Sequence, residues 1–139
     1  MKEPQLLAVH KRLDADIKSY VGWRMPIKYE GIISERLAVR KNIGLLDISH
    51  MGEIKISGNG ATDLLQYVTS NDITELEEES EHYSLILNEG RVKDDLLVYQ
   101  ITDQEYILVL DAANVNKIYS WLVSHNGKEV LIEDITLRL

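Results

Sequence analysis

The sequence contains no cysteine. Disulfide bonds, thiolate metal sites and a cysteine nucleophile are therefore excluded for this chain. Phenylalanine is also absent, so leucine, isoleucine, valine, seven tyrosines and two tryptophans must supply the volume of the core. The lack of cysteine fits a reducing compartment, and we expect a cytoplasmic location.

Positive charge is scarce. Fifteen lysines and arginines stand against 23 aspartates and glutamates, which gives a formal net charge of −8. Nucleic acids and anionic membranes are both held by clustered positive charge, so we expect neither as a partner. Residues 1–13 carry several charges in place of the apolar core of a signal peptide, and no apolar run reaches the ~20 residues that cross a bilayer.

The spacing of apolar residues predicts an α+β fold. Helices are expected at 5–13 and 31–42, with an irregular stretch at 14–29 between them. From Gly52 onward the pattern predicts the order β-α-β-β-β-α-β, which is close to the split β-α-β, ferredoxin-like order of an antiparallel sheet with two helices on one face. The expected strands cover 53–57, 82–87, 92–101, 105–110 and 129–132, with another possible at 136–139, and the helices cover 61–70 and 115–122.

This order also predicts two domains. Residues 52–139 contain enough strands and helices to bury a core of their own. Residues 1–51 form a mainly helical segment that is too short to bury enough surface alone. We therefore expect the first segment to belong to a domain that is completed by residues missing from this chain.

Asp94 and Asp95 are the most informative pair. Aspartate is depleted in strands, yet these two residues begin an apolar strand. Because side chains alternate across a strand, Asp95, Leu97 and Tyr99 share one face, and one of the two carboxylates should face the helices. A carboxylate, an aliphatic group and an aromatic ring in line suit a flat heteroaromatic ligand. Alternatively, both carboxylates lie in water at a frayed hairpin end.

Single residues elsewhere are weaker candidates. Tyr83, in the preceding strand, could join the surface of Asp95, although a lone tyrosine is more often part of a core or rim. Asp111 is expected to be a helix N-cap. His50 is either a base or, more often for such a residue, structural, and Trp23 is expected to be a packed aromatic. No metal-ligand cluster stands out, so no metal is expected.

Several short motifs, taken together, resemble the N-terminal portion of the aminomethyltransferase family, the T-protein of the glycine cleavage system. They occur in that family's order and with similar spacing, and they cover nearly the whole chain. The motifs are Gly22-Trp23-Arg24-Met25-Pro26, Ala38-Val39-Arg40, Gly44-Leu45-Leu46-Asp47-Ile48-Ser49-His50-Met51-Gly52, Ser70-Asn71-Asp72, Tyr83-Ser84 and Asp94-Asp95-Leu96-Leu97-Val98-Tyr99.

The resemblance implies a transfer reaction. T-protein moves the one-carbon unit of an aminomethyl group, held on the lipoyl arm of H-protein, to tetrahydrofolate and releases ammonia. Asp95 would be the catalytic carboxylate, which orients the pterin and stabilises positive charge on nitrogen. Residues 52–139 would then be a folate-binding type of domain. The residues lining the folate site would be Met51, Tyr83, Leu97, Tyr99 and Asp111. The family usually has asparagine in place of Asp111, which puts a contact there in doubt.

Length is the largest departure from the family. T-protein chains run well over twice as far, and we expect this chain to be incomplete without a second chain or segment that supplies further folate contacts. Three alternatives remain open: a non-catalytic folate-binding or scaffolding module, the folate-binding part of a related demethylating oxidoreductase, and an iron–sulfur assembly factor. The aspartate pair and Ser49-His50-Met51 favour T-protein over the last of these.

Overall fold

The computed structural model describes residues 1–127 and 129–136. The chain divides into two compact units, which we call the N-terminal unit (residues 1–50) and the C-terminal unit (residues 51–139). Within the described part of the chain, no helix is both long and apolar enough to cross a membrane.

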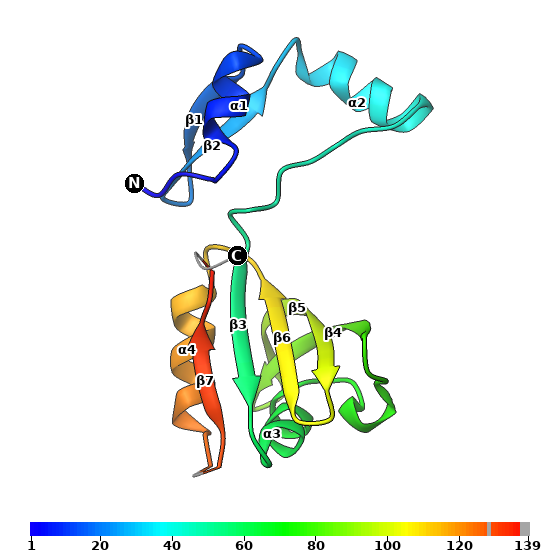
Figure 1. The fold of residues 1–139 in the computed structure, drawn as a ribbon, viewed down its shortest axis with the longest axis vertical. Coiled ribbons are helices and arrows are strands. Elements are labelled where there is room, and N and C mark those ends of the chain that lie inside the picture. Colours follow the sequence, from blue (N-terminus) through cyan, green and yellow to red (C-terminus); the bar gives the residue numbers. More distant parts are fainter. Residues whose placement is uncertain (128, 137–139) are drawn as a thin grey trace. The chain divides into compact units, whose positions relative to one another are not determined.

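The N-terminal unit combines helices with a strand hairpin (Figure 1). The expected helix at 31–42 is present, and the one at 5–13 is shorter than predicted. The elements are α1 (Leu7–Arg12), β1 (Asp16–Tyr20), β2 (Trp23–Lys28) and α2 (Ile32–Lys41).

The predicted irregular stretch at 14–29 is wrong, because β1 and β2 pair there as an antiparallel hairpin. The two residues of its turn, Val21 and Gly22, both have positive φ angles. Such a two-residue turn matches the twist of the flanking strands and is usually recognised by Asn-Gly or Asp-Gly. A β-branched valine in the first position is a poor turn signal, which explains why the hairpin was missed.

The core of the N-terminal unit is small. Leu7, Trp23 and Met25 are buried, and Trp23 is only 2% exposed, as expected for a packed aromatic. Helix α2 has no buried residue. The unit therefore leaves the apolar side chains of α2 uncovered.

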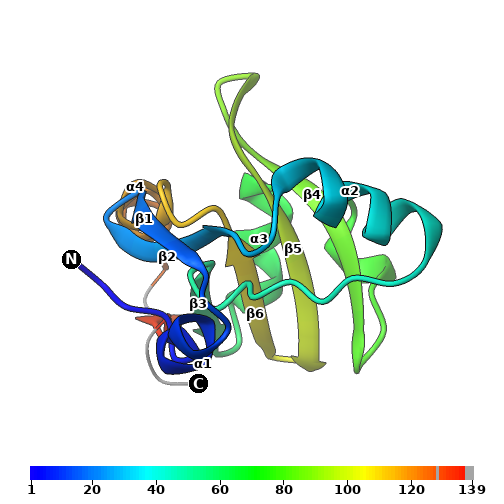
Figure 2. The ribbon, with the colours of Figure 1, turned by 90° about the horizontal axis from the view of Figure 1, so that it is seen from above.

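The C-terminal unit is an antiparallel sheet of order β4-β5-β6-β3-β7 (Figures 1 and 2). This confirms the predicted α+β class and the order of the elements. They are β3 (Gly52–Ser57), α3 (Ala61–Val68), the short 3₁₀ helix η1 (Ile73–Glu75), β4 (Ser80–Asn88), β5 (Arg91–Thr102), β6 (Glu105–Leu110), α4 (Val115–Ser124) and β7 (Leu131–Asp134).

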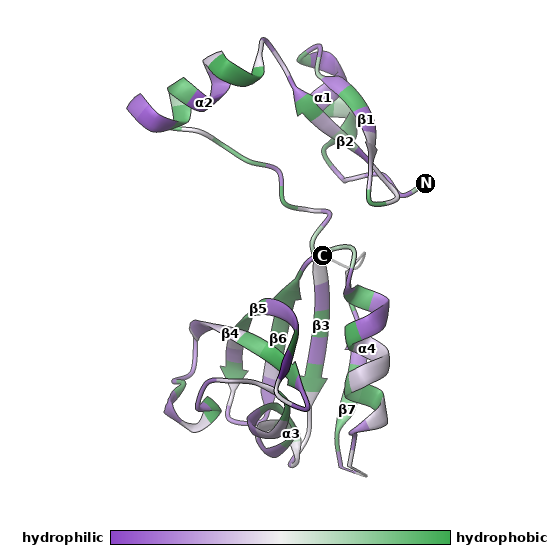
Figure 3. Ribbon diagram, turned by 180° about the vertical axis from the view of Figure 1, so that it is seen from behind, coloured by the Kyte–Doolittle hydropathy of each residue, from purple (hydrophilic) through white to green (hydrophobic). Residues whose placement is uncertain are grey.

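Both long helices of this unit pack on the same face of the sheet, with side chains from every strand in one core. Ile54 and Ile56 of β3 are fully buried there, as are Leu65 of α3 and Ile118 of α4. Figure 3 shows the corresponding alternation of polar and apolar residues along β3. None of the helices described for this unit lies on the opposite face of the sheet, and we call that face the helix-free face.

After β7, the described residues 135 and 136 form hydrogen bonds with the backbone of β3. The hydroxyl oxygen of Thr136 accepts a hydrogen bond of 3.0 Å from the backbone N–H of Glu53. The backbone N–H of Ile135 donates to the carbonyl of Glu53 at 2.9 Å. Of the further strand expected at 136–139, residues 137–139 lie outside the described residues.

Candidate functional site

Strand β5 places the candidate residues by simple alternation. Asp94, Leu96 and Val98 are buried under the helices, while the residues between them are exposed or half-buried. Asp95 and Leu97 therefore lie on the helix-free face, as does Tyr99, which follows the same alternation. The expected division of the two carboxylates between the faces is present.

The neighbouring strand adds Tyr83 to this face. Tyr83 of β4 pairs with Leu97 of β5. Its phenolic O–H donates a hydrogen bond of 2.5 Å to a carboxylate oxygen of Asp95. Sequence spacing could suggest this contact but could not establish it, because the register of the pair depends on the turn between the strands.

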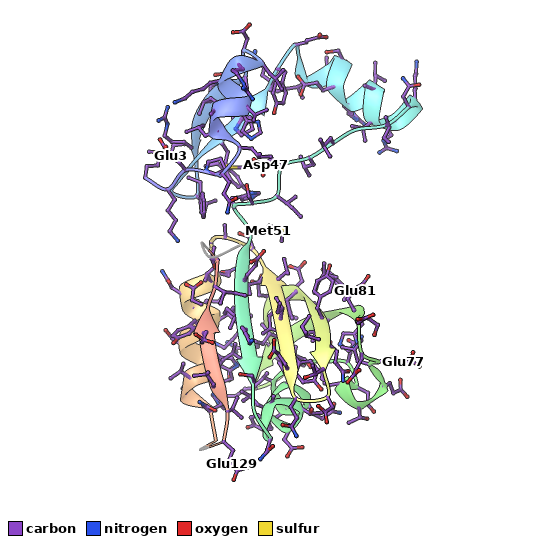
Figure 4. The ribbon with its side chains drawn as sticks, in the orientation of Figure 1. Glu3, Asp47, Met51, Glu77, Glu81 and Glu129 are labelled. Atoms are coloured by element: carbon purple, nitrogen blue, oxygen red, sulfur yellow. The ribbon has the colours of Figure 1, made fainter. Side chains whose placement is uncertain are left out.

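The strand register also places Met51 and Asp111, the two remaining candidates, near Asp95. Leu110 of β6 pairs with Gly52 on one side and with Leu96 on the other. Asp111, Met51 and Asp95 each lie one residue along from these paired positions, and therefore at the same level of the sheet. Met51 immediately precedes β3 (Figure 4). All six predicted site residues thus lie on one face of the sheet or at the strand ends next to it.

The Asp95–Tyr83 pair is open to solvent. Tyr83 is 58% exposed, and Asp95 is also exposed. The hydrogen bond to the carboxylate raises the pKa of Tyr83 above its ordinary value, with smaller contributions from desolvation and from the charges of Asp95 and Asp94. Tyr83 is therefore a hydroxyl donor that holds the Asp95 carboxylate in place.

The aspartate pair is not at a frayed end. Asp94 pairs with Ile86, and Asp95 pairs with Leu85, inside the ladder that joins β4 to β5. Asp94 is 7% exposed, and burial raises the pKa of its carboxyl group, with the charges of Asp95 and Asp111 acting in the same direction. The alternative of two fully hydrated carboxylates therefore fails for Asp94.

Asp111 differs from its predicted role as a helix N-cap. Its side chain accepts a hydrogen bond of 2.8 Å from the backbone N–H of Ala113, within the turn that precedes α4. The helix begins at Val115, and Asn114 occupies the N-cap position. The local competition of an aspartate side chain for nearby N–H groups explains the change, because it stabilises a turn in place of the first helical turn.

Glu53, which was not among the predicted site residues, lies on the same face as Asp95. Glu53 pairs with Val109, and Val109 pairs with Leu97. Desolvation raises the pKa of the Glu53 carboxyl, and its Oε2 atom is buried without a hydrogen-bond partner. The alternation of residues 53–57 contained this signal, since it placed Glu53 opposite the buried isoleucines.

A hydrogen-bond network in the N-terminal unit was also missed. His10 is 4% exposed, and its Nε2 atom lies 2.5 Å from Asp47 Oδ2. Its Nδ1 atom lies 2.8 Å from the hydroxyl of Tyr29. Ser49 donates to the other oxygen of Asp47 through its backbone N–H and its hydroxyl. We call these four residues the His10 network.

The His10 network has clear electrostatic consequences. The pKa of Asp47 is lowered because hydrogen bonds from Ser49 and His10 outweigh the desolvation that opposes them. Desolvation, followed by the charges of Asp47 and Glu35, raises the pKa of Tyr29. Tyr29 and Asp47 line a cavity of about 360 Å³ together with His50, whose Nδ1 atom is buried without a partner. The rings of His50 and Tyr20 are in edge contact.

Comparison with known proteins shows the family to which the chain belongs. The family model described as the GCVT N-terminal domain matches residues 6–139. The aminomethyltransferase of Chloroherpeton thalassium is 43% identical over 136 residues, and that of Desulforamulus reducens is 43% identical over 137 residues. These matches cover 96% and 98% of this chain, respectively, but only 38% of each relative.

A solved structure gives the same result. The glycine cleavage system aminomethyltransferase T from Bartonella henselae matches with a TM-score of 0.89 and 31% sequence identity. The match covers 97% of this chain and 38% of that protein. The chain thus spans well under half the length of the relatives it matches. On the evidence of the family model and these relatives, the chain belongs to the GCVT N-terminal domain family of aminomethyltransferases.

Proposed function

We propose that this chain supplies the first part of a folate-dependent aminomethyltransferase. The reaction transfers the one-carbon unit of an aminomethyl group, carried on the lipoyl arm of H-protein, to tetrahydrofolate with release of ammonia. A cytoplasmic location and lipoylated H-protein as partner belong to the same proposal. The observation that carries it is the Asp95 carboxylate, held by Tyr83 on an exposed sheet face, in a chain whose relatives are named aminomethyltransferases.

The residues present suit a reduced pterin. The ring of a pterin is flat and carries N–H donors, and Asp95 offers a carboxylate that accepts hydrogen bonds. Leu97 and Tyr99 provide half-buried apolar surface on the same face of β5. Asp111, with Met51 at the same level of the sheet, extends the surface with a second carboxylate. We assign Asp95 as the catalytic residue and the other four, with Tyr83, as residues that line the folate site.

Each of these side chains has a physical task. Folate supplies the nitrogen atoms that accept the one-carbon unit. The negative charge of Asp95 stabilises positive charge that develops on nitrogen during transfer. The hydrogen bond from Tyr83 prevents the Asp95 side chain from rotating freely, which keeps the charge aimed before the reaction begins.

The assay for this role is ammonia release from lipoyl-bound aminomethyl groups in the presence of tetrahydrofolate, with the remaining length of the enzyme supplied. Asp95→Asn keeps the size of the side chain and removes its charge. Loss of one aimed electrostatic contact typically costs about a hundredfold in kcat. Asp103→Asn makes the same change at an exposed aspartate in the turn between β5 and β6, and this matched control should leave kcat unchanged. A normal kcat for Asp95→Asn removes Asp95 from the chemistry.

The N-terminal unit gives the second part of the proposal. Its helix α2 exposes Ile32, Ile33 and Val39 by 62%, 76% and 61%. Contiguous exposed apolar side chains mark a surface that another part of a protein covers. Because the chain spans 38% of its relatives, we propose that residues corresponding to the rest of an aminomethyltransferase complete the domain begun by residues 1–51.

Hydrogen exchange tests this completion. The amides of α2 are measured in the chain alone and after addition of a polypeptide that corresponds to the rest of the relatives' length. Protection of α2, together with folate-dependent turnover only in the mixture, supports a completed enzyme. Folate binding by the chain alone without any turnover in the mixture supports the non-catalytic alternative, and unchanged exchange in α2 contradicts the completed domain.

A further inference from the structure

Strand β5 is irregular next to Asp95. Ile86 of β4 pairs with Asp94, but the following Leu87 pairs with Val92, so that Lys93 is an extra residue in the ladder. A bulge of this kind leaves a residue without its ladder partner and changes the direction of the side chains around it. The backbone just before Asp94 and Asp95 therefore lacks part of the support that a regular ladder gives.

The first turn of helix α4 contacts both sides of this bulge. Lys117 Nζ donates a hydrogen bond of 2.7 Å to the carbonyl oxygen of Lys93, the extra residue itself. Asn114 Nδ2 donates a hydrogen bond of 3.0 Å to Asp94 Oδ1. Lys117 Nζ also donates to Asn114 Oδ1 at 3.1 Å, which joins the two contacts.

The buried carboxylate of Asp94 is an unusual feature of these contacts. Asp94 is 7% exposed, and its Oδ2 atom is buried without a hydrogen-bond partner. An unpaired buried carboxylate oxygen carries a free-energy cost of desolvation. Leucine or valine, which the sheet uses at the neighbouring buried positions of β5, would avoid that cost. The contact between Asp94 and Asn114 is therefore not explained by packing of the core.

We propose that Asp94, Asn114 and Lys117 are positioning residues that hold Asp95 in the orientation needed for folate. This inference rests on the proposed role of Asp95 and assigns no direct contact with folate to the three residues. They act through the backbone, since Lys93 and Asp94 immediately precede Asp95 and both are tied to α4. We call the three residues the α4 brace.

The hydrogen bond between Tyr83 and Asp95 reports on the α4 brace without any ligand. If Asp95 turns away, Tyr83 loses its acceptor and its pKa should fall toward the ordinary value of 10.0. The signal of Tyr83 is followed by NMR in protein with ¹³C-labelled tyrosine and is assigned by its absence from Tyr83→Phe. Asp95→Asn gives the reference for loss of the carboxylate.

Asn114→Ala is the main test variant. It removes both contacts of the Asn114 side chain without changing the charge, and Asn114 makes no side-chain capping hydrogen bond that would be lost with it. We expect the Tyr83 pKa to fall toward that of Asp95→Asn. Asn116→Ala is the matched control, because it makes the same change at an exposed position in the same helical turn, and it should leave the Tyr83 pKa as in the wild type.

Lys117→Met provides a second test that does not depend on the folding of the first variant. Loss of a positive charge can only raise the pKa of a tyrosine or leave it unchanged. A fall in the Tyr83 pKa therefore reports loss of the hydrogen bonds. Lys117→Arg keeps a donor at this position and should restore the wild-type value.

Measurements of kcat distinguish a failure of this inference from a failure of the proposed function. In the completed enzyme, Asn114→Ala and Lys117→Met should lower kcat roughly tenfold to a hundredfold, because the Asp95 charge is displaced. A wild-type Tyr83 pKa and kcat in both variants overturns the α4 brace, even where Asp95→Asn is inactive. A normal kcat for Asp95→Asn overturns the proposed function instead, whatever the Tyr83 signal shows.

Discussion

The His10 network allows a prediction about stability that is independent of folate. Asp47→Ala removes a carboxylate whose side chain is 6% exposed and which faces His10, with a side chain 5% exposed. The substitution leaves His10 Nε2 and two donors of Ser49 without their acceptor. Leaving a buried donor without its acceptor costs about 1 to 3 kcal/mol, and we expect about 3 kcal/mol because His10 and the half-buried Ser49 lose the Asp47 carboxylate together.

The position of the two tryptophans makes this measurable. Trp23 is buried in the N-terminal unit, and Trp121 belongs to α4 of the C-terminal unit. In a Trp121→Phe background, urea unfolding followed by fluorescence therefore reports on the N-terminal unit alone. Glu30→Ala, an exposed carboxylate in the same unit, is the control and should change the free energy of unfolding by less than about 0.5 kcal/mol.

The pH dependence has a definite sign. Because the pKa of Asp47 is lower in the folded chain than its ordinary value of 3.8, its contribution is fully present above that value. The contribution is lost as the pH falls through the folded pKa, so the difference between wild type and Asp47→Ala should shrink in acid. A difference below about 1 kcal/mol at neutral pH, or one that grows in acid, refutes the reasoning.

Four further substitutions test the C-terminal unit. Gly58→Ala should cost more than about 2 kcal/mol in urea unfolding, because its Cβ would lie 2.1 Å from the carbonyl oxygen of Glu129. Gly90→Ala meets no atom within 4 Å and should cost only about 1 kcal/mol, from its positive φ angle. Asp94→Asn should raise the melting temperature at neutral pH, because the raised pKa of Asp94 makes its charged form unfavourable in the folded state, and it should lose this advantage as the pH falls through the folded pKa toward the ordinary value of 3.8. Ile118→Ala should cost about 3 kcal/mol in the same unfolding assay, since Ile118 is fully buried. Equal costs at the two glycines, no gain for Asp94→Asn at neutral pH, or a cost below about 1 kcal/mol for Ile118→Ala would contradict these expectations.

Periodicity predicted the C-terminal unit well, because each element there repeats a simple pattern. The alternation of residues 53–57 and the helical spacing of residues 61–68 each arise because one face of the element is buried. Buried positions are occupied by apolar residues, so the sequence alone shows which face is buried. The hairpin at residues 16–28 lacks such a pattern of apolar residues, since its strands belong to a small core. Its turn contains Val21, which is not a typical turn residue. Weak burial and an unusual turn residue left it without a readable signal.

Alternation along strand β5 also predicted which candidate site residues share a face, but it could not predict contacts between different strands. Alternation alone places Asp95 and Leu97 on one face. The contact of Tyr83 with Asp95 depends on the register of two strands, and Glu53 was recognised only when its burial was known. The role of Asp111 changed because a turn, which depends on local competition for hydrogen bonds, replaced the start of the helix.

The sequence by itself determined the α+β class of residues 52–139, the strand that carries Asp95, and the family to which the motifs belong. The fold class and the strand are properties of neighbouring residues that hydrophobic patterning specifies locally, whereas the family follows from the resemblance of the motifs. Only the tertiary structure decided which distant residues meet: Lys117 with the carbonyl of Lys93, and His10 with Asp47. Such contacts depend on register and on helix placement, because a shift of one residue along a strand exchanges its two faces.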